Sequence, residues 1–301
     1  MGARVAAAPL AALMVLASAA CSPPAPEPGE PEGLPDGLTL EVRQGRLDVP
    51  QGLLVLHFAN SGDPLEVSGF EVHSPALRPG MTRDDPFELG RDDAIDIRLP
   101  LPGTVCDGDP TEVGVEVRVV AADGGERTGT LVPDDPFDTM ARIAATDCLA
   151  ESVAAVAAIE LPDRLRTTGA DAAMRAWIDV RVVPVASAST GGGSGDGAVD
   201  HTLSIAGVAA TTLIGDEDGG DWALDLEVAA GDEPVDVPLA VRPARCDAHG
   251  IADDKRGTIL PFDVATGDGR EGRLEFASGD ALKADLYAYY TERCGLDRPA
   301  G

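Results

Sequence analysis

Two stretches of this sequence, 140 residues apart, share one pattern that ends in Cys-Asp. Residues 92–107 (DDAIDIRLPLPGTVCD) align with residues 232–247 (DEPVDVPLAVRPARCD), so that Cys106 falls on Cys246. Apolar and polar residues alternate in both stretches, which is typical of a strand with one buried face. Self-similarity at a fixed spacing predicts that the chain contains two copies of one structural unit.

In both copies the cysteine is followed by a hairpin pattern and then by a helical pattern that ends at a second cysteine. Alternating apolar residues lie on either side of the turns at 123–125 (DGG) and 267–269 (GDG). Such turns between alternating runs predict β-hairpins. Residues 135–148 and 278–294 then place apolar side chains at helical spacing.

The five cysteines are Cys21, Cys106, Cys148, Cys246 and Cys294. The last four could pair in three ways. The repeat favours Cys106 with Cys148 and Cys246 with Cys294, because any other pairing would join units that the repeat separates. Cys21 is then left over, and an unpaired cysteine in an oxidising compartment requires an explanation.

The N-terminus has the pattern of a signal peptide. Residues 1–20 contain a short segment with Arg4, an apolar segment and a final run of small residues. Residues 21–37 form a Pro/Glu-rich stretch whose prolines oppose both helix and central strand, so we expect a disordered tether.

The residues Ser18-Ala19-Ala20-Cys21 resemble the cleavage site of a bacterial lipoprotein leader. The resemblance implies cleavage before Cys21, a diacylglycerol group on its thiol, and an exported protein anchored to the outer face of the cell membrane. The sequence departs from the family at Ser18, where Leu is typical. The alternative is ordinary signal-peptidase cleavage after Ala19, which would release a soluble protein.

Strand patterns also precede each Cys-Asp pair, which gives about seven short strands and a terminal helix per copy. We therefore expect a mainly β protein with two tandem immunoglobulin-like β-sandwich domains, at 38–150 and 151–297, each ending in a short helix closed by a disulfide. The likeness to immunoglobulin domains is architectural, because the Cys, Trp, Cys pattern of true members is missing.

The Cys21 leader, the Pro/Glu-rich tether and the paired Cys-Asp units together resemble the two-domain lipoproteins of high-GC Gram-positive envelopes. That group is uncharacterised and has no assigned activity to transfer. The resemblance implies a place at the cell envelope.

The charge balance constrains the partners. With 52 acidic and 23 basic residues the net charge is −29, which repels phosphate. Nucleic-acid binding depends on clustered Lys and Arg, so we expect no nucleic-acid partner. The expected partners are the membrane, through the N-terminal lipid, and an unknown protein or envelope polymer.

No ordered catalytic or cofactor motif is present. The histidines His57, His73, His201 and His249 lack metal-ligand spacing, no Cys-x-x-Cys occurs, and residues 192–196 miss the last Gly of Gly-x-Ser-x-Gly. We expect no cofactor and no metal. The acidic run at 215–221 (GDEDGGD) could bind calcium, but it departs from an EF-hand loop, and a polar turn before Trp222 is the better explanation.

These observations predict a non-catalytic binding, scaffold or accessory module. Two alternatives stay open. The chain could be an envelope hydrolase whose site forms only in the fold, or a calcium-dependent adhesion module that uses its acidic turns.

If Cys21 carries the lipid, replacing it with Ala should move the protein from the detergent-soluble membrane fraction to the medium, because the anchor is lost. Detergent-phase partitioning with immunoblotting measures this. A wild-type protein whose mature N-terminus carries an unmodified Cys21 thiol would contradict the anchor.

Overall fold

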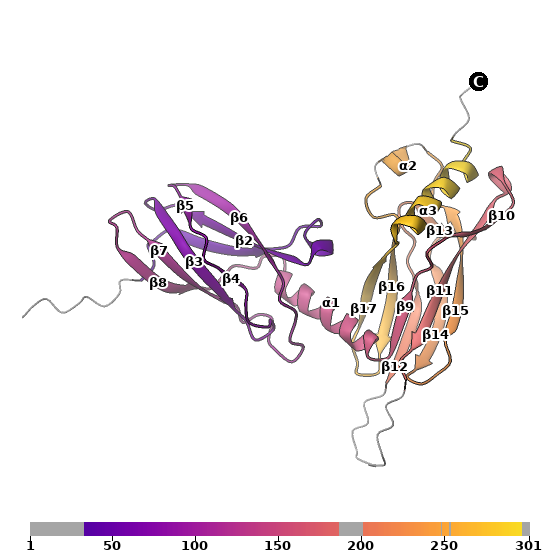
Figure 1. The fold of residues 1–301 in the computed structure, drawn as a ribbon, viewed down its shortest axis with the longest axis horizontal. Coiled ribbons are helices and arrows are strands. Elements are labelled where there is room, and N and C mark those ends of the chain that lie inside the picture. Colours follow the sequence, from indigo (N-terminus) through magenta and orange to yellow (C-terminus); the bar gives the residue numbers. More distant parts are fainter. Residues whose placement is uncertain (1–32, 187–200, 248, 253, 297–301) are drawn as a thin grey trace, which may run out of the picture.

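The computed structural model describes residues 33–186, 201–247, 249–252 and 254–296. The chain is mainly β, with four antiparallel sheets, as expected from the sequence (Figure 1). The predicted signal peptide, the tether as far as residue 32 and the lipidation site Cys21 lie outside the described residues. Within the described part, no helix is long and apolar enough to cross a membrane.

The N-terminal half contains a three-stranded sheet, β1-β2-β6, and a five-stranded sheet, β4-β3-β7-β8 with β5 also paired to β3. A short 3₁₀ helix, η1 (Val49–Gln51), precedes β2. The strand bounds are β1 Leu38–Arg43, β2 Leu53–Asn60, β3 Leu65–His73, β4 Thr82–Arg83, β5 Phe87–Leu89, β6 Asp93–Pro100, β7 Gly114–Val120 and β8 Glu126–Leu131.

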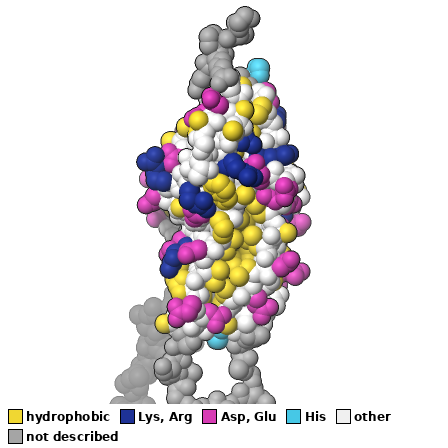
Figure 2. All heavy atoms as spheres, turned by 90° about the vertical axis from the view of Figure 1, so that its right-hand side faces the viewer, with side chains coloured by type: hydrophobic (Ala, Val, Ile, Leu, Met, Phe, Trp, Pro, Cys, Tyr) yellow, Lys and Arg dark blue, Asp and Glu magenta, His cyan; other side chains and the backbone are white. Residues whose placement is uncertain are grey.

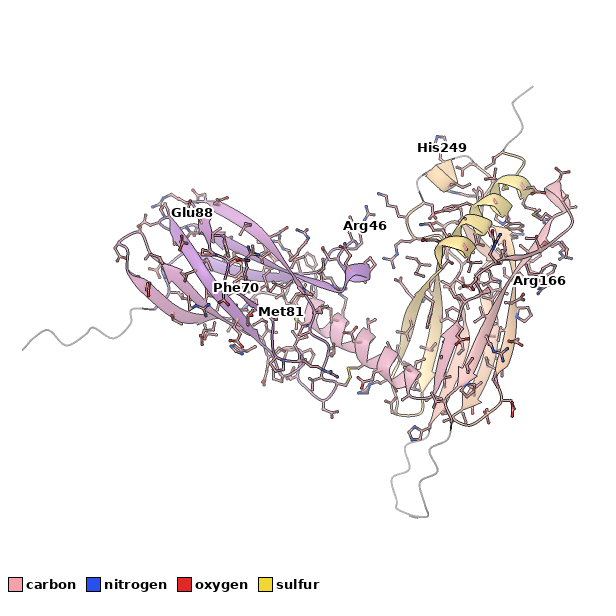
Figure 3. All side chains as sticks on the ribbon, in the orientation of Figure 1. Arg46, Phe70, Met81, Glu88, Arg166 and His249 are labelled. Atoms are coloured by element: carbon pink, nitrogen blue, oxygen red, sulfur yellow. A yellow bond between two sulfur atoms is a disulfide. The ribbon has the colours of Figure 1, made fainter. Side chains whose placement is uncertain are left out.

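The inward faces of these two sheets share one hydrophobic cluster, drawn from residues between Leu38 and Ile143. Phe58 and Phe70, one from each sheet, lie at its centre with ring centroids 5.2 Å apart. Phe70 and Met81 are labelled in Figure 3, and both are buried. Two sheets packed face to face in this way form a sandwich-like arrangement.

The C-terminal half repeats the arrangement with a five-stranded sheet, β10-β11-β15-β13 with β9 paired to β11, and a four-stranded sheet, β14-β12-β16-β17. A second 3₁₀ helix, η2, spans Asp171–Ala173. The strand bounds are β9 Ala157–Glu160, β10 Arg166–Thr168, β11 Arg175–Pro184, β12 Thr202–Val208, β13 Ile214–Asp216, β14 Trp222–Ala229, β15 Val235–Pro243, β16 Ile259–Thr266 and β17 Glu271–Ala277.

The two halves follow the same strand order around their Cys-Asp pairs. The strand before the pair is β6 in one half and β15 in the other, and each adjoins the preceding long strand of its sheet, β2 or β11. The hairpin after the pair, β7-β8 or β16-β17, belongs to the other sheet of its half, where its first strand pairs with β3 or β12. The second hydrophobic cluster draws on residues between Leu149 and Tyr290.

Both disulfides that the repeat predicts are present. Cys106 bonds to Cys148 and Cys246 bonds to Cys294, with sequence separations of 42 and 48 residues. In the chain-entropy account, closing loops of this length stabilises the fold by about 4 kcal/mol each. That contribution matters in a chain with only 4% aromatic residues, because rings bury the most apolar area per side chain.

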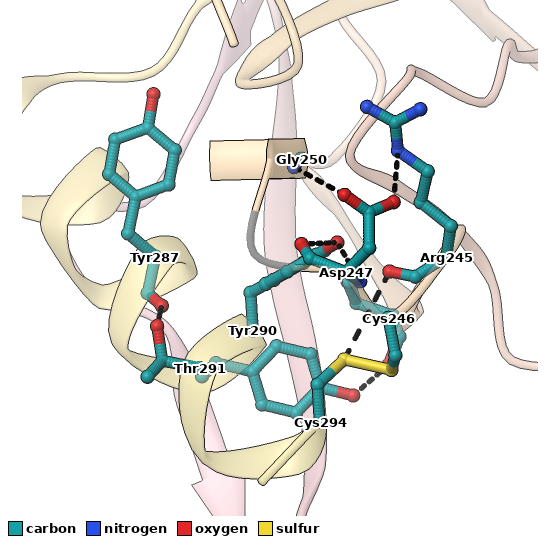
Figure 4. Close-up of a disulfide and its surroundings, with 10 residues drawn as sticks. Arg245, Cys246, Asp247, Gly250, Tyr287, Tyr290, Thr291 and Cys294 are labelled. Carbon is teal, nitrogen blue, oxygen red and sulfur yellow. Dashed lines mark hydrogen bonds and ion pairs between the residues drawn. A yellow bond between two sulfur atoms is a disulfide. The ribbon is translucent and has the colours of Figure 1, made fainter. Parts of the chain in front are cut away.

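The second disulfide closes the C-terminal helix, α3 (Asp280–Arg293), where Cys294 is the C-cap (Figure 4). The buried Tyr290 hydroxyl donates a hydrogen bond to the carbonyl oxygen of Asp247, at 3.3 Å. The Asp247 carboxylate accepts from the backbone N–H of Gly250, in the one-turn helix α2 (His249–Ala252). The disulfide therefore holds the end of α3 against a loop that is itself fixed by hydrogen bonds.

The first helix differs from the sequence prediction. Instead of ending at Cys148, α1 spans Thr139–Ala154 and contains Cys148 in its interior. The carboxylate of Asp135 accepts hydrogen bonds from the backbone N–H groups of Thr139 and Met140 at its start. The helix continues past the cysteine because the next residues are good helix formers and include apolar side chains that become buried.

Those apolar side chains belong to the other hydrophobic cluster. Met140 and Ile143, in the first half of α1, pack into the first cluster, whereas Leu149 and Val153 pack into the second. Figure 1 shows α1 running from one group of sheets to the other. One helix thus forms part of both cores.

Replacing Leu149 with Ala should lower the free energy of unfolding of the C-terminal core by about 2–5 kcal/mol, because a buried side chain 4% exposed is removed from it. Urea denaturation followed by far-UV circular dichroism measures the change. The neighbouring exposed variant Ala150→Ser serves as the control and should cost less than about 1 kcal/mol. Equal effects of the two variants would contradict the placement of Leu149.

Candidate functional site

A small cavity of about 220 Å³ lies where the C-terminal half of α1 meets the turn between β16 and β17. We call it the junction cavity. The first disulfide forms part of its wall, and the residues around it bring together hydroxyl, carboxylate, imidazole and guanidinium groups. Its polar lining consists of Glu151, Ser152, His201, Thr266, Asp268 and Arg270.

Three of these side chains form a tight hydrogen-bonded group. The Ser152 hydroxyl donates to Oδ2 of Asp268 at 2.7 Å, and the Thr266 hydroxyl donates to Oδ1 at 2.6 Å. The two hydroxyl oxygens lie 2.9 Å apart. The Asp268 carboxylate also accepts from the backbone N–H of Arg270 at 3.2 Å, which closes the turn.

The electrostatics of Asp268 follow from these contacts. Hydrogen bonds from Thr266, then from Ser152, hold the pKa of the Asp268 carboxyl below its ordinary value. The guanidinium of Arg270, whose Nη1 lies 3.5 Å from Oδ2, acts in the same direction. The carboxylate is therefore charged at neutral pH and accepts hydrogen bonds from both α1 and its own turn.

The geometry favours a structural role for this group over a catalytic one. A serine nucleophile requires a base that accepts its proton and a third group that orients that base. Here Ser152 donates straight to a carboxylate whose pKa is lowered, which makes it a weak base. The hydrogen bonds of Asp268 connect the β16-β17 turn to α1, and they thereby connect a C-terminal sheet to the helix.

The four histidines lie in four different places. His57 on β2 contacts Asp96 on β6, with Nδ1 2.7 Å from Oδ1, and His73 lies at the end of β3, 3.9 Å from Glu71. His201 lines the junction cavity, and the exposed His249 begins α2 (Figure 3). In the described part of the chain, no three His, Cys, Asp or Glu side chains are grouped as they would be to hold a metal ion.

The acidic run at 215–221 forms a turn between β13 and β14, and its side chains have separate partners. Oδ1 of Asp221 accepts from the backbone N–H of Ala210 at 2.7 Å. The Glu217 carboxylate lies 3.3 Å from Arg293 and 3.6 Å from Arg175. The geometry of this segment is that of a polar turn, with left-handed glycines at Gly219 and Gly220.

Sequence reasoning did not find the junction cavity. Ser152 and Asp268 are 116 residues apart, and each lies in a pattern that has an ordinary explanation, a helix and a turn. Nothing in their spacing indicates that they meet. Only the unexpected extension of α1 past Cys148 brings them together.

No protein-family model and no curated protein matches this chain. Among solved structures, red sea bream transglutaminase covers 81% of the chain at 10% identity and a TM-score of 0.24, over 31% of its own length. The BSP domain of a biofilm-associated protein covers 81% at 10% identity and a TM-score of 0.20, over 59% of its length. The exo-chitosanase CsxA of Amycolatopsis orientalis covers 79% at 8% identity and a TM-score of 0.19, over 26% of its length.

The strand pairing makes the described chain a mainly β protein, and TM-scores of 0.24 and below are too low to assign it to a fold family. It spans about a third of the length of the transglutaminase. The activities of those proteins are not transferred to this chain.

Replacing Asp268 with Asn should lower the free energy of unfolding at pH 7 by about 1 kcal/mol, because charged hydrogen-bond acceptors are lost. The folded-state pKa of Asp268 is lowered. Its contribution is therefore complete above the unfolded-state pKa of about 3.9 and is lost as the pH falls through the folded-state value. The difference between wild type and variant should narrow below about pH 4, as measured by urea denaturation across pH.

Glu271→Gln is the matched control, since it removes one negative charge from an exposed position at the start of β17. It should change stability by less than about 0.5 kcal/mol. A pH-independent difference for Asp268→Asn would show that the hydrogen-bonded carboxylate does not stabilise the junction.

Proposed function

We propose that the chain is a non-catalytic exported lipoprotein that acts as a binding, scaffold or accessory module at the cell envelope. In this proposal Cys21 carries the lipid, residues 21–37 hold the body away from the membrane, and residues 38–150 and 151–297 are two tandem immunoglobulin-like β-sandwich domains. The partners are the membrane, through the lipid, and a protein or polymer of the envelope.

The observation that carries this proposal is the way α1 joins two similar units. Met140 and Ile143 pack into one hydrophobic cluster and Leu149 and Val153 into the other, so a single helix connects the two. Proteins that present surfaces to a partner benefit from such a connection, because a rigid arrangement loses less entropy on binding.

The junction cavity supports the same role. Its hydroxyl and carboxylate groups bind one another, and they join α1 to the β16-β17 turn. The disulfide between Cys106 and Cys148 lies in the same wall. The disulfide and the hydrogen bonds attach to the same part of α1, and together they favour a fixed connection between the two units.

The sequence supports the envelope location. The lipoprotein-like leader ends at Cys21, and the remaining four cysteines form two disulfides, which is the pattern of a protein that folds outside the reducing cytosol. The net charge of −29 favours partners that are neutral or basic.

To test the proposal, purified and fluorescently labelled Cys21→Ala protein is added to cells from which the gene for this protein has been deleted. Saturable binding that unlabelled protein displaces is the expected result, because the body itself carries the partner surface. Binding that does not saturate would contradict a specific partner.

The hydrolase alternative is tested in parallel on purified envelope material. Release of soluble fragments by the wild-type protein, and its loss in Ser152→Ala, would overturn the non-catalytic proposal. Glu271→Gln again provides a surface control for the preparation.

A further inference from the structure

Among the described residues, the C-terminal sandwich is open along one side, where β14 is the edge of one sheet and β13 covers only part of β15 in the other. β14 pairs only with β12 among the described strands, and β13 covers β15 only at Val241–Pro243. The inward-facing Leu224 and Leu226 of β14 and Val235 and Val237 of β15 are half-buried and pack against the hydrophobic cluster. We call these four residues the β14–β15 seam.

Figure 2 faces the side of the molecule on which Figure 1 labels β14 and β15, and it shows a band of hydrophobic side chains with charged side chains on its borders. At the start of β14 the seam is closed by Trp222, whose indole N–H donates to the carbonyl oxygen of Ala240 at 2.6 Å. Beyond this bond, no strand of the described chain pairs with the outer side of β14 or with Val235–Ala240 on that side of β15.

The N-terminal half provides an internal comparison. There β5 pairs with β3, as β14 pairs with β12, and its Leu89 is 1% exposed. Phe87 of β5 packs edge-on against Phe58, with ring centroids 5.4 Å apart. The corresponding side of the first sandwich is thus filled by an aromatic and a buried leucine, whereas the second retains half-buried aliphatic residues.

Alternation along β14 defines what could bind beside it. Leu224 and Leu226 face inward, while Asp225 and Glu227 between and after them are exposed. A strand added along β14 would place alternate side chains in the seam and the others beside the two acids. Opposite charges stabilise such cross-strand pairs and like charges oppose them.

The same acids disfavour a second copy of this chain as the occupant. Two β14 strands side by side would bring Asp225 and Glu227 of each copy together, and both copies carry a net charge of −29.

We propose that the β14–β15 seam is a docking site for an extended segment of a partner protein in which apolar residues alternate with Lys or Arg. Its backbone would extend the four-stranded sheet at β14, its apolar side chains would cover the seam, and its basic side chains would lie beside Asp225 and Glu227. This inference rests on the proposed binding role and specifies the partner's chemistry.

The probe is a fluorescein-labelled peptide of eight residues, the length of β14, in which Val and Lys alternate. It should bind the full chain with saturation, as measured by fluorescence anisotropy, whereas the same peptide with Glu in place of Lys should not. A peptide of the same composition with all Lys before all Val should bind at least about tenfold more weakly, because it cannot alternate. Equal binding of the alternating and block peptides would overturn the proposal in favour of simple charge attraction.

The variant Glu227→Lys changes only an exposed side chain, so the fold should be retained. It should weaken binding of the Val-Lys peptide by about tenfold and allow the Val-Glu peptide to bind. Glu88→Lys is the matched control, since Glu88 is the exposed middle residue of β5 in the first sandwich (Figure 3). Unchanged affinity in Glu227→Lys, or equal losses in the two variants, would overturn the site.

Two further measurements separate the remaining outcomes. Hydrogen–deuterium exchange should slow at the amides of β14 when the Val-Lys peptide is bound, and protection elsewhere alone would contradict strand addition. Sedimentation equilibrium of the free protein should show a monomer, and a dimer that Glu227→Lys changes would assign the seam to a second copy instead. If the wild-type protein and Glu227→Lys bind cells equally, the proposed binding function is retained, but the β14–β15 seam is not the surface that binds.

Discussion

Helix α1 contributes buried side chains to two hydrophobic clusters, and the relation between the two halves depends on it. Met140 and Ile143 are held by the first pair of sheets, and Leu149 and Val153 by the second. Because a helix advances by a fixed rise and turn per residue, the two sets of contacts are set in both distance and rotation. The disulfide at Cys148 and the hydrogen bond from Ser152 to Asp268 add attachments on the same helix. The buried side chains, the disulfide and the hydrogen bond that link the two halves are therefore all on α1.

The repeat made much of the fold predictable because it combines two independent signals. Alternation through residues 92–101 and 232–241 indicates strands, and β6 and β15 are found there. The aligned cysteines then give the pairing without any geometry, and both bonds are present. The end of the first helix could not be predicted in the same way, since the burial of Leu149 and Val153 that holds its last turns in place depends on the second core. The two copies differ at this point for that reason.

The junction cavity and the seam could not be predicted from the sequence either, because both are formed by residues that are far apart in the chain. A hydroxyl on α1 and a carboxylate in a turn become partners only after the helix has been placed against β16 and β17. The seam exists because β14 has a neighbouring strand on one side only. Which strands become neighbours in a sandwich depends on distant parts of the chain. The alternation in β15 could be predicted from the sequence, but which apolar residues of β14 and β15 would stay half-buried could not. In the first half, Phe87 covers the corresponding position, and its role too depends on where the short β5 pairs.

The Cys106–Cys148 bond also determines how the chain can respond to tension. When a pull is applied between the N-terminus and the second core, the force passes through this bond and bypasses the segment between the two cysteines, which are 42 positions apart and flank β7 and β8. At about 3.4 Å per extended residue, roughly 140 Å of contour length cannot be drawn out while the bond is intact. A protein held at one end to a surface and at the other to a partner would stretch less before it ruptures, and reduction would release that stored length.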